Sequence, residues 1–257
     1  MTDQSSQFLK FYVTAASPCP YIDGQVERKI FTELSQPRIA YDLDAILHRT
    51  PIDAFAEKLH QSLTLVGFRR SQDIAYRPAC ENCHQCKSVR VLVKSFVPTR
   101  SQKRIINKNK DIYRTIKINV ATEEHYHLLK KYLHSRHNEG GMANLTFTDF
   151  QAMVESSPIN TKIIEYRSKN NELVGVALTD FMSRAASMVY SFYDVSSEMK
   201  QHSLGTYMVL DHIRYAAKHE LDHIYLGYWV KNSQKMNYKQ NFKPLEVLNS
   251  DGWEIIK

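Results

Sequence analysis

Four cysteines are the residues best suited to do chemistry in this 257-residue chain. Cys80, Cys83 and Cys86 form a C-x2-C-x2-C pattern, and Cys19 precedes a proline far upstream. Three thiolates at this spacing fit three corners of an iron–sulfur cube, and four thiolates can also hold a structural zinc ion. A reduced cluster without metal is the alternative. Because thiolates this close repel one another unless a cation or proton intervenes, we expect a bound metal, with iron and zinc both open.

Positive charge is concentrated in one segment. Between Lys87 and Lys117, ten lysines and arginines face a single acid, so the segment carries +9 while the net charge is +7 and the remainder sums to −2. Such a strip suits a polyphosphate partner, although a solvated basic face is the alternative. We expect a basic helix from about 101 to 110 that binds nucleic-acid phosphates through Arg100, Lys103, Arg104 and Lys108. The lack of a zinc-finger or helix-turn-helix pattern argues against duplex DNA.

A third candidate site lies between residues 187 and 239. The stretch is expected to form a strand ending in Tyr193 and Asp194, then a turn at Ser203-Leu204-Gly205 that opens an amphipathic helix. Free N–H groups at the start of a helix can bind a phosphate or a developing oxyanion. An ordinary N-cap serine followed by glycine has the same pattern.

A second strand of this stretch ends at Tyr228, which could equally be a core aromatic residue. A short polar helix follows it. We expect this helix to be too short to form a core, so its side chains are assigned to substrate contact: Lys235, Tyr238 and Lys239.

The elements that position these groups follow from hydrophobic periodicity. Strands are expected at 161–167, 172–182, 186–195 and 223–230, with helices at 123–137 and 204–219. The order predicts an α+β protein. A soft boundary near residue 121 divides a smaller α+β region with the cysteines and the basic segment (1–121) from the strand-helix unit (122–257).

Composition limits the class of protein. Hydrophobic residues make up 43% and charged residues 24%, as is usual for soluble globular proteins. No window approaches the ~18 apolar residues of a membrane span, and the N-terminus lacks the pattern of a secretory signal. We therefore expect a cytoplasmic protein with no membrane partner.

The chain as a whole resembles the bacterial aminoacyl-tRNA–protein transferases, in particular the aspartate/glutamate leucyltransferases of the N-end rule pathway. The resemblance spans nearly the whole chain and includes an ordered set of motifs: C-P-Y-I at 19–22, Y-R-P-A-C-x-x-C-x-x-C at 76–86, R-S-Q-K-R at 100–104, R-H-x-x-G-G-M at 136–142, S-F-Y-D-V at 191–195, S-L-G-T-Y at 203–207, Y-L-G-Y-W-V at 225–230 and K-M-N-Y-K at 235–239.

The resemblance implies a transferase that moves leucine from leucyl-tRNA to the α-amine of proteins beginning with Asp or Glu and so marks them for degradation. It also implies that the C-terminal part is similar to N-acetyltransferases (GNAT), with a mixed sheet and flanking helices. Aminoacyl-tRNA would be the co-substrate in place of acetyl-CoA. Eukaryotic relatives look like iron–sulfur binders in their cysteine region.

For such a reaction we expect Asp194 to orient or deprotonate the attacking amine. Tyr193 or Tyr228 would donate a hydrogen bond to the oxyanion or to the departing ribose oxygen. The acceptor's carboxylate must meet a cation, for which Arg77, Lys235 and Lys239 are the candidates. Ser203 and Gly205 complete the predicted substrate-binding residues.

Two other functions fit parts of the sequence. An acetyl-CoA-dependent N-acetyltransferase would normally show a glycine-richer loop than H-S-L-G-T-Y at 202–207. A non-enzymatic, metal-bearing RNA-binding module would explain residues 1–120 but leave the polar residues of 189–239 unused. The residues alone leave the donor amino acid, leucine or arginine, open.

Overall fold

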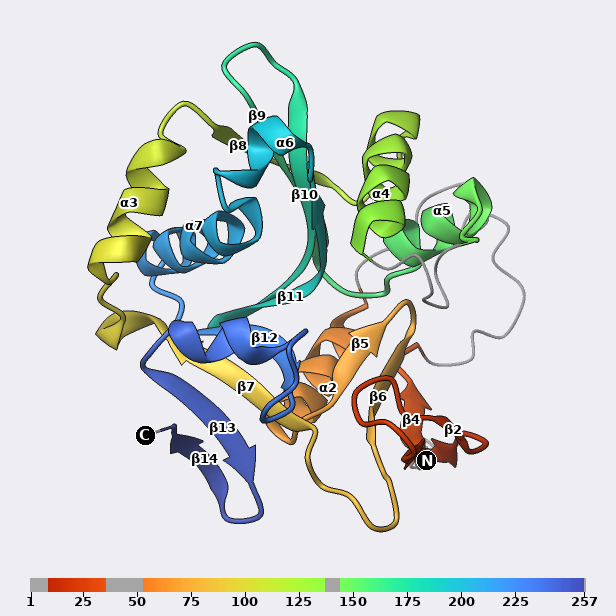
Figure 1. Ribbon diagram of the computed structural model, residues 1–257. Helices are drawn as coiled ribbons and strands as arrows, with labels where there is room; N and C mark the ends of the chain where they lie inside the picture. Colours follow the sequence, from red (N-terminus) through yellow and green to blue (C-terminus); the bar gives the residue numbers. More distant parts are fainter. Residues whose placement is uncertain (1–8, 36–52, 137–143, 257) are drawn as a thin grey trace, which may run out of the picture.

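The computed structural model describes residues 9–35, 53–136 and 144–256. A large mixed sheet organises this part of the chain (Figure 1), with strand order β14-β13-β7-β12-β11-β10-β9-β8. Its strands are β7 (Lys87–Leu92), β8 (Tyr113–Ile118), β9 (Thr161–Arg167), β10 (Leu173–Met182), β11 (Ala185–Tyr193), β12 (His223–Trp229), β13 (Leu245–Asn249) and β14 (Gly252–Ile255). Only β11 and β12 pair in parallel; the other neighbours are antiparallel.

Helices cover both faces of this sheet. On one face α7 (Leu204–Lys218) buries an apolar side against β7, β10 and β12, and α3 (Arg100–Lys108) lies beside it. On the other face α4 (Glu123–Arg136) and α5 (Phe147–Glu155) pack on β9, β10 and β11 (Figure 1). The expected α+β class, with a mixed sheet flanked by helices, is confirmed.

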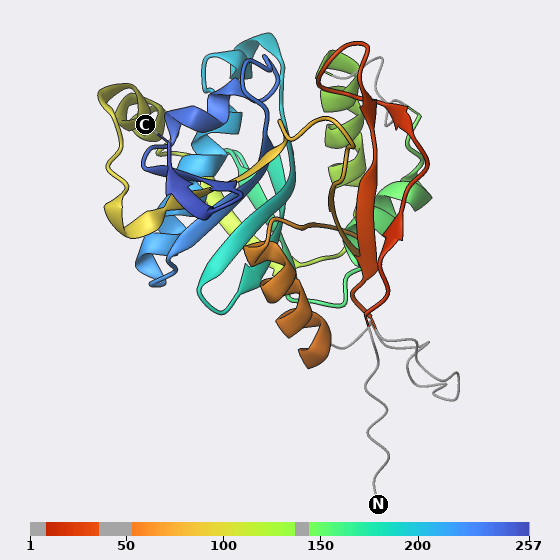
Figure 2. The same cartoon turned by 90° about the horizontal axis from the view of Figure 1, so that it is seen from below.

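A smaller sheet stands beside the large one (Figure 2). Its order is β1-β4-β6-β5, and a separate two-stranded sheet pairs β2 with β3. Helix α2 packs on the small sheet. The bounds are β1 (Tyr12–Val13), β2 (Ser17–Pro18), β3 (Val26–Glu27), β4 (Lys29–Glu33), α2 (Ala54–Leu65), β5 (Arg69–Ser71) and β6 (Ile74–Pro78).

A buried ion pair joins the two sheets. The guanidinium of Arg70 on β5 donates to both carboxylate oxygens of Asp180 on β10, each at 2.7 Å, and both side chains are fully buried. Thr161 adds a 2.7 Å hydrogen bond to the same carboxylate. Because removing one partner of such a pair leaves a buried charge uncompensated, the pair fixes the two sheets against each other.

The predicted strands and helices of the C-terminal half are confirmed to within two residues at their described ends. The boundary near residue 121 stays a prediction. Strands β7 and β8, which precede it, are hydrogen-bonded into the same sheet as the strands that follow it.

The parallel strands β11 and β12 separate along their length. They pair only at their first three residues, Ala185–Ser187 with His223–Tyr225. A bulge in β11 lies between the partners of Leu178 and Thr179, and another irregularity in β12 precedes Gly227, whose φ is +79°. Because bulges bend strands, the later parts of β11 and β12 are not paired with each other, and we call the region between their carboxyl ends the wedge. No described helix is both long and apolar enough to cross a bilayer.

Candidate functional site

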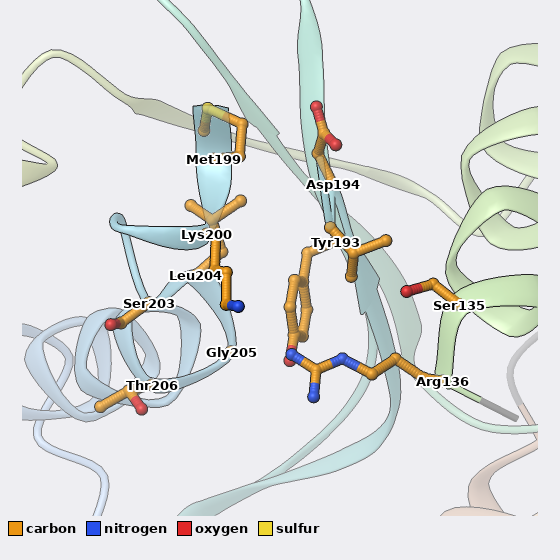
Figure 3. A pocket seen from close by; sticks show the side chains of 11 residues that line it. Ser135, Arg136, Tyr193, Asp194, Met199, Lys200, Ser203, Leu204, Gly205 and Thr206 are labelled. Atoms are coloured by element: carbon orange, nitrogen blue, oxygen red, sulfur yellow. The ribbon is translucent and has the colours of Figure 1, made fainter. Parts of the chain in front are cut away.

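A cavity of about 460 Å³ lies where β11 ends and α7 begins (Figure 3). Four of the predicted site residues line it together, although they come from two separate segments: Tyr193, Asp194, Ser203 and Gly205. The remaining walls come from the end of α4 and from the loop around α6 (Ser197–Lys200), and include Ser135, Arg136, Val195, Met199, Lys200, Leu204 and Thr206. We call this cavity the α7 pocket.

The N-terminus of α7 faces the α7 pocket without a side-chain cap. Ser203, the N-cap residue, has left-handed backbone angles (φ 52°, ψ 45°), and its hydroxyl makes no capping hydrogen bond. The first N–H groups of the helix, those of Leu204, Gly205 and Thr206, have no intrahelical partner by geometry. They form a site for an anion, which the helix dipole strengthens.

Two cations add to this positive end. Arg136, the last residue of α4, extends across the α7 pocket toward Tyr193 and the start of α7 in Figure 3, and Lys200 lies on the opposite wall. Neither forms an ion pair with a carboxylate of the described residues. The α7 pocket is therefore suited to a phosphate or another anion.

Tyr193 lies directly against the first turn of α7 because residue 205 is glycine. A Cβ at Gly205 would lie 2.9 Å from the Tyr193 hydroxyl and 2.9 Å from its Cε1. On its other side the ring meets Tyr132 of α4, with centroids 5.0 Å apart. Gly205 and α4 thus hold the Tyr193 hydroxyl beside the free N–H groups.

We expect Gly205→Ala to destabilise the protein by about 1–2 kcal/mol, because the added methyl group must displace the Tyr193 ring. Chemical denaturation measures this cost. In a Tyr193→Ala background the same substitution has no ring to displace, so its cost should vanish or turn into the small gain of helix propensity. An equal cost in both backgrounds would show that Tyr193 is not what Gly205 accommodates.

Two hydrogen bonds fix Asp194, one through its backbone N–H and one through its side chain. Its N–H donates to the carbonyl of Val174 on β10 at 2.9 Å, and its Oδ1 accepts from the N–H of Ser196 at 2.8 Å. The half-buried Asp194 lines the α7 pocket at the end of β11, and in Figure 3 its carboxylate points away from the Tyr193 hydroxyl and from Arg136. Among the described residues that line the pocket it is the only carboxylate, and hence their one candidate proton acceptor of that kind.

The other predicted acyl-site tyrosine lies elsewhere. The buried hydroxyl of Tyr228 donates to the carbonyls of Gly67 (2.9 Å) and Tyr76 (3.0 Å), and burial raises the pKa of its phenol. Tyr228 is not among the residues of the α7 pocket. It connects β12 to the smaller sheet.

The predicted carboxylate-binding cations are separated in the structure. Arg77 is exposed and stacks on Phe68 at 5.3 Å. Lys235 is exposed and precedes the short helix, which is a 3-10 helix, η2 (Asn237–Asn241). Lys239 is buried and donates to the carbonyl of Tyr228. The sequence predicts a helix too short to form a core; η2 nevertheless packs on β12 and buries Lys239, whose part in substrate contact stays a prediction.

Tyr238, the neighbour of Lys239, is 45% exposed and lies close enough to Tyr193 for their phenols to interact electrostatically. Helix η2 therefore brings Tyr238 near Tyr193, one of the residues that line the α7 pocket.

The basic segment divides into paired and unpaired cations. Arg90, Lys94, Arg114 and Lys117 form ion pairs with Glu246, Asp222, Asp211 and Glu165. The four predicted phosphate ligands on α3 are exposed and form no ion pair within the described residues: Arg100, Lys103, Arg104 and Lys108. Four of the six cations of the segment that form no ion pair within the described residues therefore lie on α3, and the other two are Lys87 and Lys110.

Helix α3 ends beside the α7 pocket. Its N-terminus is fixed by a capping box between Thr99 and Gln102. At its other end Lys108 donates to Gln201 at 3.0 Å, and the side chain of Asn109 donates to the carbonyl of His202 at 2.9 Å. Because His202 directly precedes Ser203, the basic helix and the pocket belong to neighbouring parts of one surface.

All four cysteines converge on a second, smaller cavity of about 80 Å³, which His84 and Glu27 also line. Each thiol is free and partly buried, and the Cys80 thiol donates to the Arg28 carbonyl at 3.8 Å. Within residues 9–35, 53–136 and 144–256, no group of three or more His, Cys, Asp or Glu side chains is arranged to hold a metal ion. The donor types fit a thiolate-bound metal, whereas the side chains do not surround a common ligand position.

Sequence reasoning missed Arg136 and Lys200 as parts of the α7 pocket. Arg136 belongs to a motif that carried the family resemblance, and this was the available signal. Lys200 had none, because its position depends on the loop between β11 and α7.

Two family models match the chain. The model described as Arginine-tRNA-protein transferase, N terminus, matches residues 17–104, and the corresponding C-terminus model matches residues 124–249. Among curated proteins, the aspartate/glutamate leucyltransferase of Parvibaculum lavamentivorans is 47% identical over 254 residues and 98% of each chain. That of Mesorhizobium japonicum is 44% identical over 264 residues, covering 99% of this chain and 96% of the relative.

Solved structures give weaker likenesses. FemX aligns with a TM-score of 0.44 at 10% identity, over 89% of this chain and 81% of its own. A conserved protein of unknown function from Bacteroides thetaiotaomicron aligns with a TM-score of 0.47 at 10% identity, over 85% and 79%.

Proposed function

The chain belongs to the aminoacyl-tRNA–protein transferase family that includes the aspartate/glutamate leucyltransferases, and from this membership we propose that it transfers leucine from leucyl-tRNA to the N-terminal α-amine of proteins beginning with Asp or Glu. The observation that carries the proposal is the α7 pocket, where uncapped helix N–H groups and two cations lie beside Tyr193 and Asp194. The product would be a protein with a new N-terminal leucine, a degradation signal made in the cytoplasm.

The donor's esterified 3′ end fits the α7 pocket. Its terminal phosphate would lie against the first N–H groups of α7, between Arg136 and Lys200. The rest of the tRNA would extend along α3, whose unpaired cations begin next to His202. A row of exposed, unpaired cations that leads to the pocket is what an electrostatic nucleic-acid interface requires.

Transfer needs little covalent help from the protein, because an aminoacyl ester is already activated. The acceptor's neutral amine attacks the ester carbonyl carbon, a C–N bond forms, and the C–O bond to the ribose breaks. Asp194 takes a proton from the attacking amine, and the departing ribose oxygen gains one. The Tyr193 hydroxyl donates to the oxyanion or to that ribose oxygen. Holding amine and ester at attack distance can supply roughly 7–11 kcal/mol.

A single assay tests this function. The protein is mixed with labelled leucyl-tRNA or with labelled acetyl-CoA, and with a peptide beginning with Asp. Label should move to the peptide from leucyl-tRNA only. Transfer from acetyl-CoA would instead indicate an N-acetyltransferase, and binding of tRNA without transfer would indicate an RNA-binding module. Labelled arginyl-tRNA, added as a third donor, shows whether the protein transfers leucine or arginine.

We also propose that Cys19, Cys80, Cys83 and Cys86 hold an iron–sulfur cluster or a zinc ion. The support is their convergence on one small cavity from two distant segments. Either metal would link the β2–β3 region to the loop between β6 and β7, a structural task with no part in the transfer itself.

We expect anaerobically purified protein to contain metal and Cys83→Ser to lose it, because three thiolates hold such a centre less well than four. Elemental analysis and the visible absorption spectrum distinguish zinc from iron and sulfide. His84→Ala is the matched control, since His84 lines the same cavity without being a proposed ligand. Wild-type protein that takes up neither metal would contradict the proposal.

A further inference from the structure

Two buried cations lie outside the α7 pocket and have no carboxylate partner. Lys239 on η2 is 7% exposed, and Arg69 on β5 is also 7% exposed. Neither forms an ion pair within the part of the chain that the structure describes. Burying an unpaired charge is costly, and buried charges in proteins are normally paired. An uncompensated pair of cations thus points to an anion that comes from outside the chain.

The Lys239 ammonium lies at the edge of β12 where β11 has separated from it. Its Nζ donates to the carbonyl of Tyr228, a residue past the last pair between the two strands. Nζ is also 3.7 Å from the position that a Cβ of Gly227 would take, so the ammonium packs against the backbone of β12 at this glycine. Lys239 therefore binds β12 at a position past its pairing with β11, next to the wedge.

Arg69 lies on the other side of Tyr228. Its guanidinium stacks on the rings of Tyr225 (5.0 Å) and Tyr228 (5.8 Å), and it donates to Ser88 and to the carbonyl of Phe68. Its Nε is buried and has no hydrogen-bond partner in the structure. The guanidinium therefore keeps an unused donor in addition to its unpaired charge.

The two cations act on each other. Burial and the nearby charge of Arg69 lower the pKa of Lys239 to about 7. Within the described residues, the groups that act on the Lys239 ammonium are the guanidinium of Arg69 and the ring of Tyr238, whose centroid lies 5.9 Å from Nζ. No acid is among them, so an incoming carboxylate would be the first group to favour the protonated lysine.

This inference rests on the proposed function. We propose that Lys239, supported by Arg69, binds the acidic side chain of the acceptor's first residue and so selects Asp or Glu. The acceptor's N-terminal Asp or Glu would enter the wedge with its carboxylate toward Lys239. Its α-amine would then point toward the end of β11, where Tyr193 and Asp194 lie. The exposed Tyr238 on the same helix lies near Tyr193, which connects the two positions. Neutral Asn or Gln would leave both cations unpaired.

The test compares leucine transfer to two peptides that differ only in starting with Asp or Asn. For the wild-type protein kcat/KM should favour Asp. In Lys239→Met the Asp peptide should lose about 30-fold or more, chiefly through KM, while the Asn peptide loses little, so that the ratio approaches one. Lys218→Met, the same change at the exposed last residue of α7, is the control and should keep the wild-type ratio.

The outcomes separate the two proposals. If wild-type protein transfers leucine to neither peptide, the proposed function fails and this site with it. If wild-type protein transfers leucine but Lys239→Met keeps the Asp preference, only the assignment of Lys239 is overturned. An equal loss with both peptides also overturns it, since that would mark a purely structural role.

If Lys239→Met does not fold, a measurement on the wild-type protein tests the same site. In NMR spectra of lysine-labelled protein, the ammonium that titrates near pH 7 should shift its titration upward when the Asp peptide is added, and should not respond to the Asn peptide. An identical response to both peptides would contradict the site.

Discussion

Replacing Asp194 by asparagine should slow leucine transfer about 100- to 10,000-fold at neutral pH while leaving the affinity for leucyl-tRNA unchanged. This is the usual range for losing a positioned proton acceptor. Asparagine keeps the oxygen that accepts from the N–H of Ser196, so the turn after β11 remains and only the charge is lost. Single-turnover rates with preformed complexes, together with filter binding of the tRNA, measure the two quantities separately.

A pH series sharpens the Asp194 prediction. A free α-amine has a pKa of about 7.7–8.0, so above pH 8 the acceptor is already neutral and only the proton released on attack still needs an acceptor. Asp194→Asn should therefore recover part of its activity as the pH rises. Asp194→Ala is the comparison that also breaks the bond to Ser196, and it should lose stability as well. An Asp194→Asn enzyme as fast as wild type at pH 7 would remove this residue from the mechanism.

Neutralising α3 should produce the second large effect. Changing Arg100, Lys103, Arg104 and Lys108 to glutamine should weaken tRNA binding roughly 100-fold at low salt. It should also reduce the slope of log K against log salt by about 3, because each lost phosphate contact removes about 0.7–0.9 from it. The fold should persist, since the buried side chains that fix α3, such as Gln102, are unchanged.

A charge-matched control accompanies the α3 variant. Four exposed lysines on other elements and loops, Lys10, Lys58, Lys169 and Lys218, are changed to glutamine together. This variant has the same net charge but keeps α3, so its salt dependence should match that of wild type. If both variants weaken equally, tRNA is attracted by the overall charge and α3 is not its binding surface.

Much of the fold followed from local pattern. The strands at 161–167 and 173–182 and the helix at 204–218 were predictable because their apolar residues recur with the period of a strand or a helix. The meeting of Tyr193 with Gly205 was predictable for the same reason, since a strand followed by a helix places both at one sheet edge.

The rest depended on contacts between distant segments. No local pattern shows that Tyr228 donates to Gly67, or that Lys239 turns inward to its carbonyl. A lysine in a polar run is normally solvated, and the burial of Lys239 depends on η2 packing against β12, a contact between segments that no local pattern shows. The charge count also does not show that Arg90, Lys94, Arg114 and Lys117 pair with remote acids. Most of the cations of the basic segment that stay unpaired within the described residues are those on α3.

The strand order has a consequence for how this protein is made. β7, from the first half of the chain, lies between β12 and β13, which are among the last strands to be synthesised. While the ribosome is still translating residues 93–222, neither of the two strands that pair with β7 has been made. The apolar side chains of Val89 and Val91, which are completely buried in the folded protein, therefore stay exposed during this time. Sheets completed by such sequence-distant strands fold slowly. The nascent chain is therefore a natural client for chaperones, and a fragment ending before β12 should aggregate rather than fold.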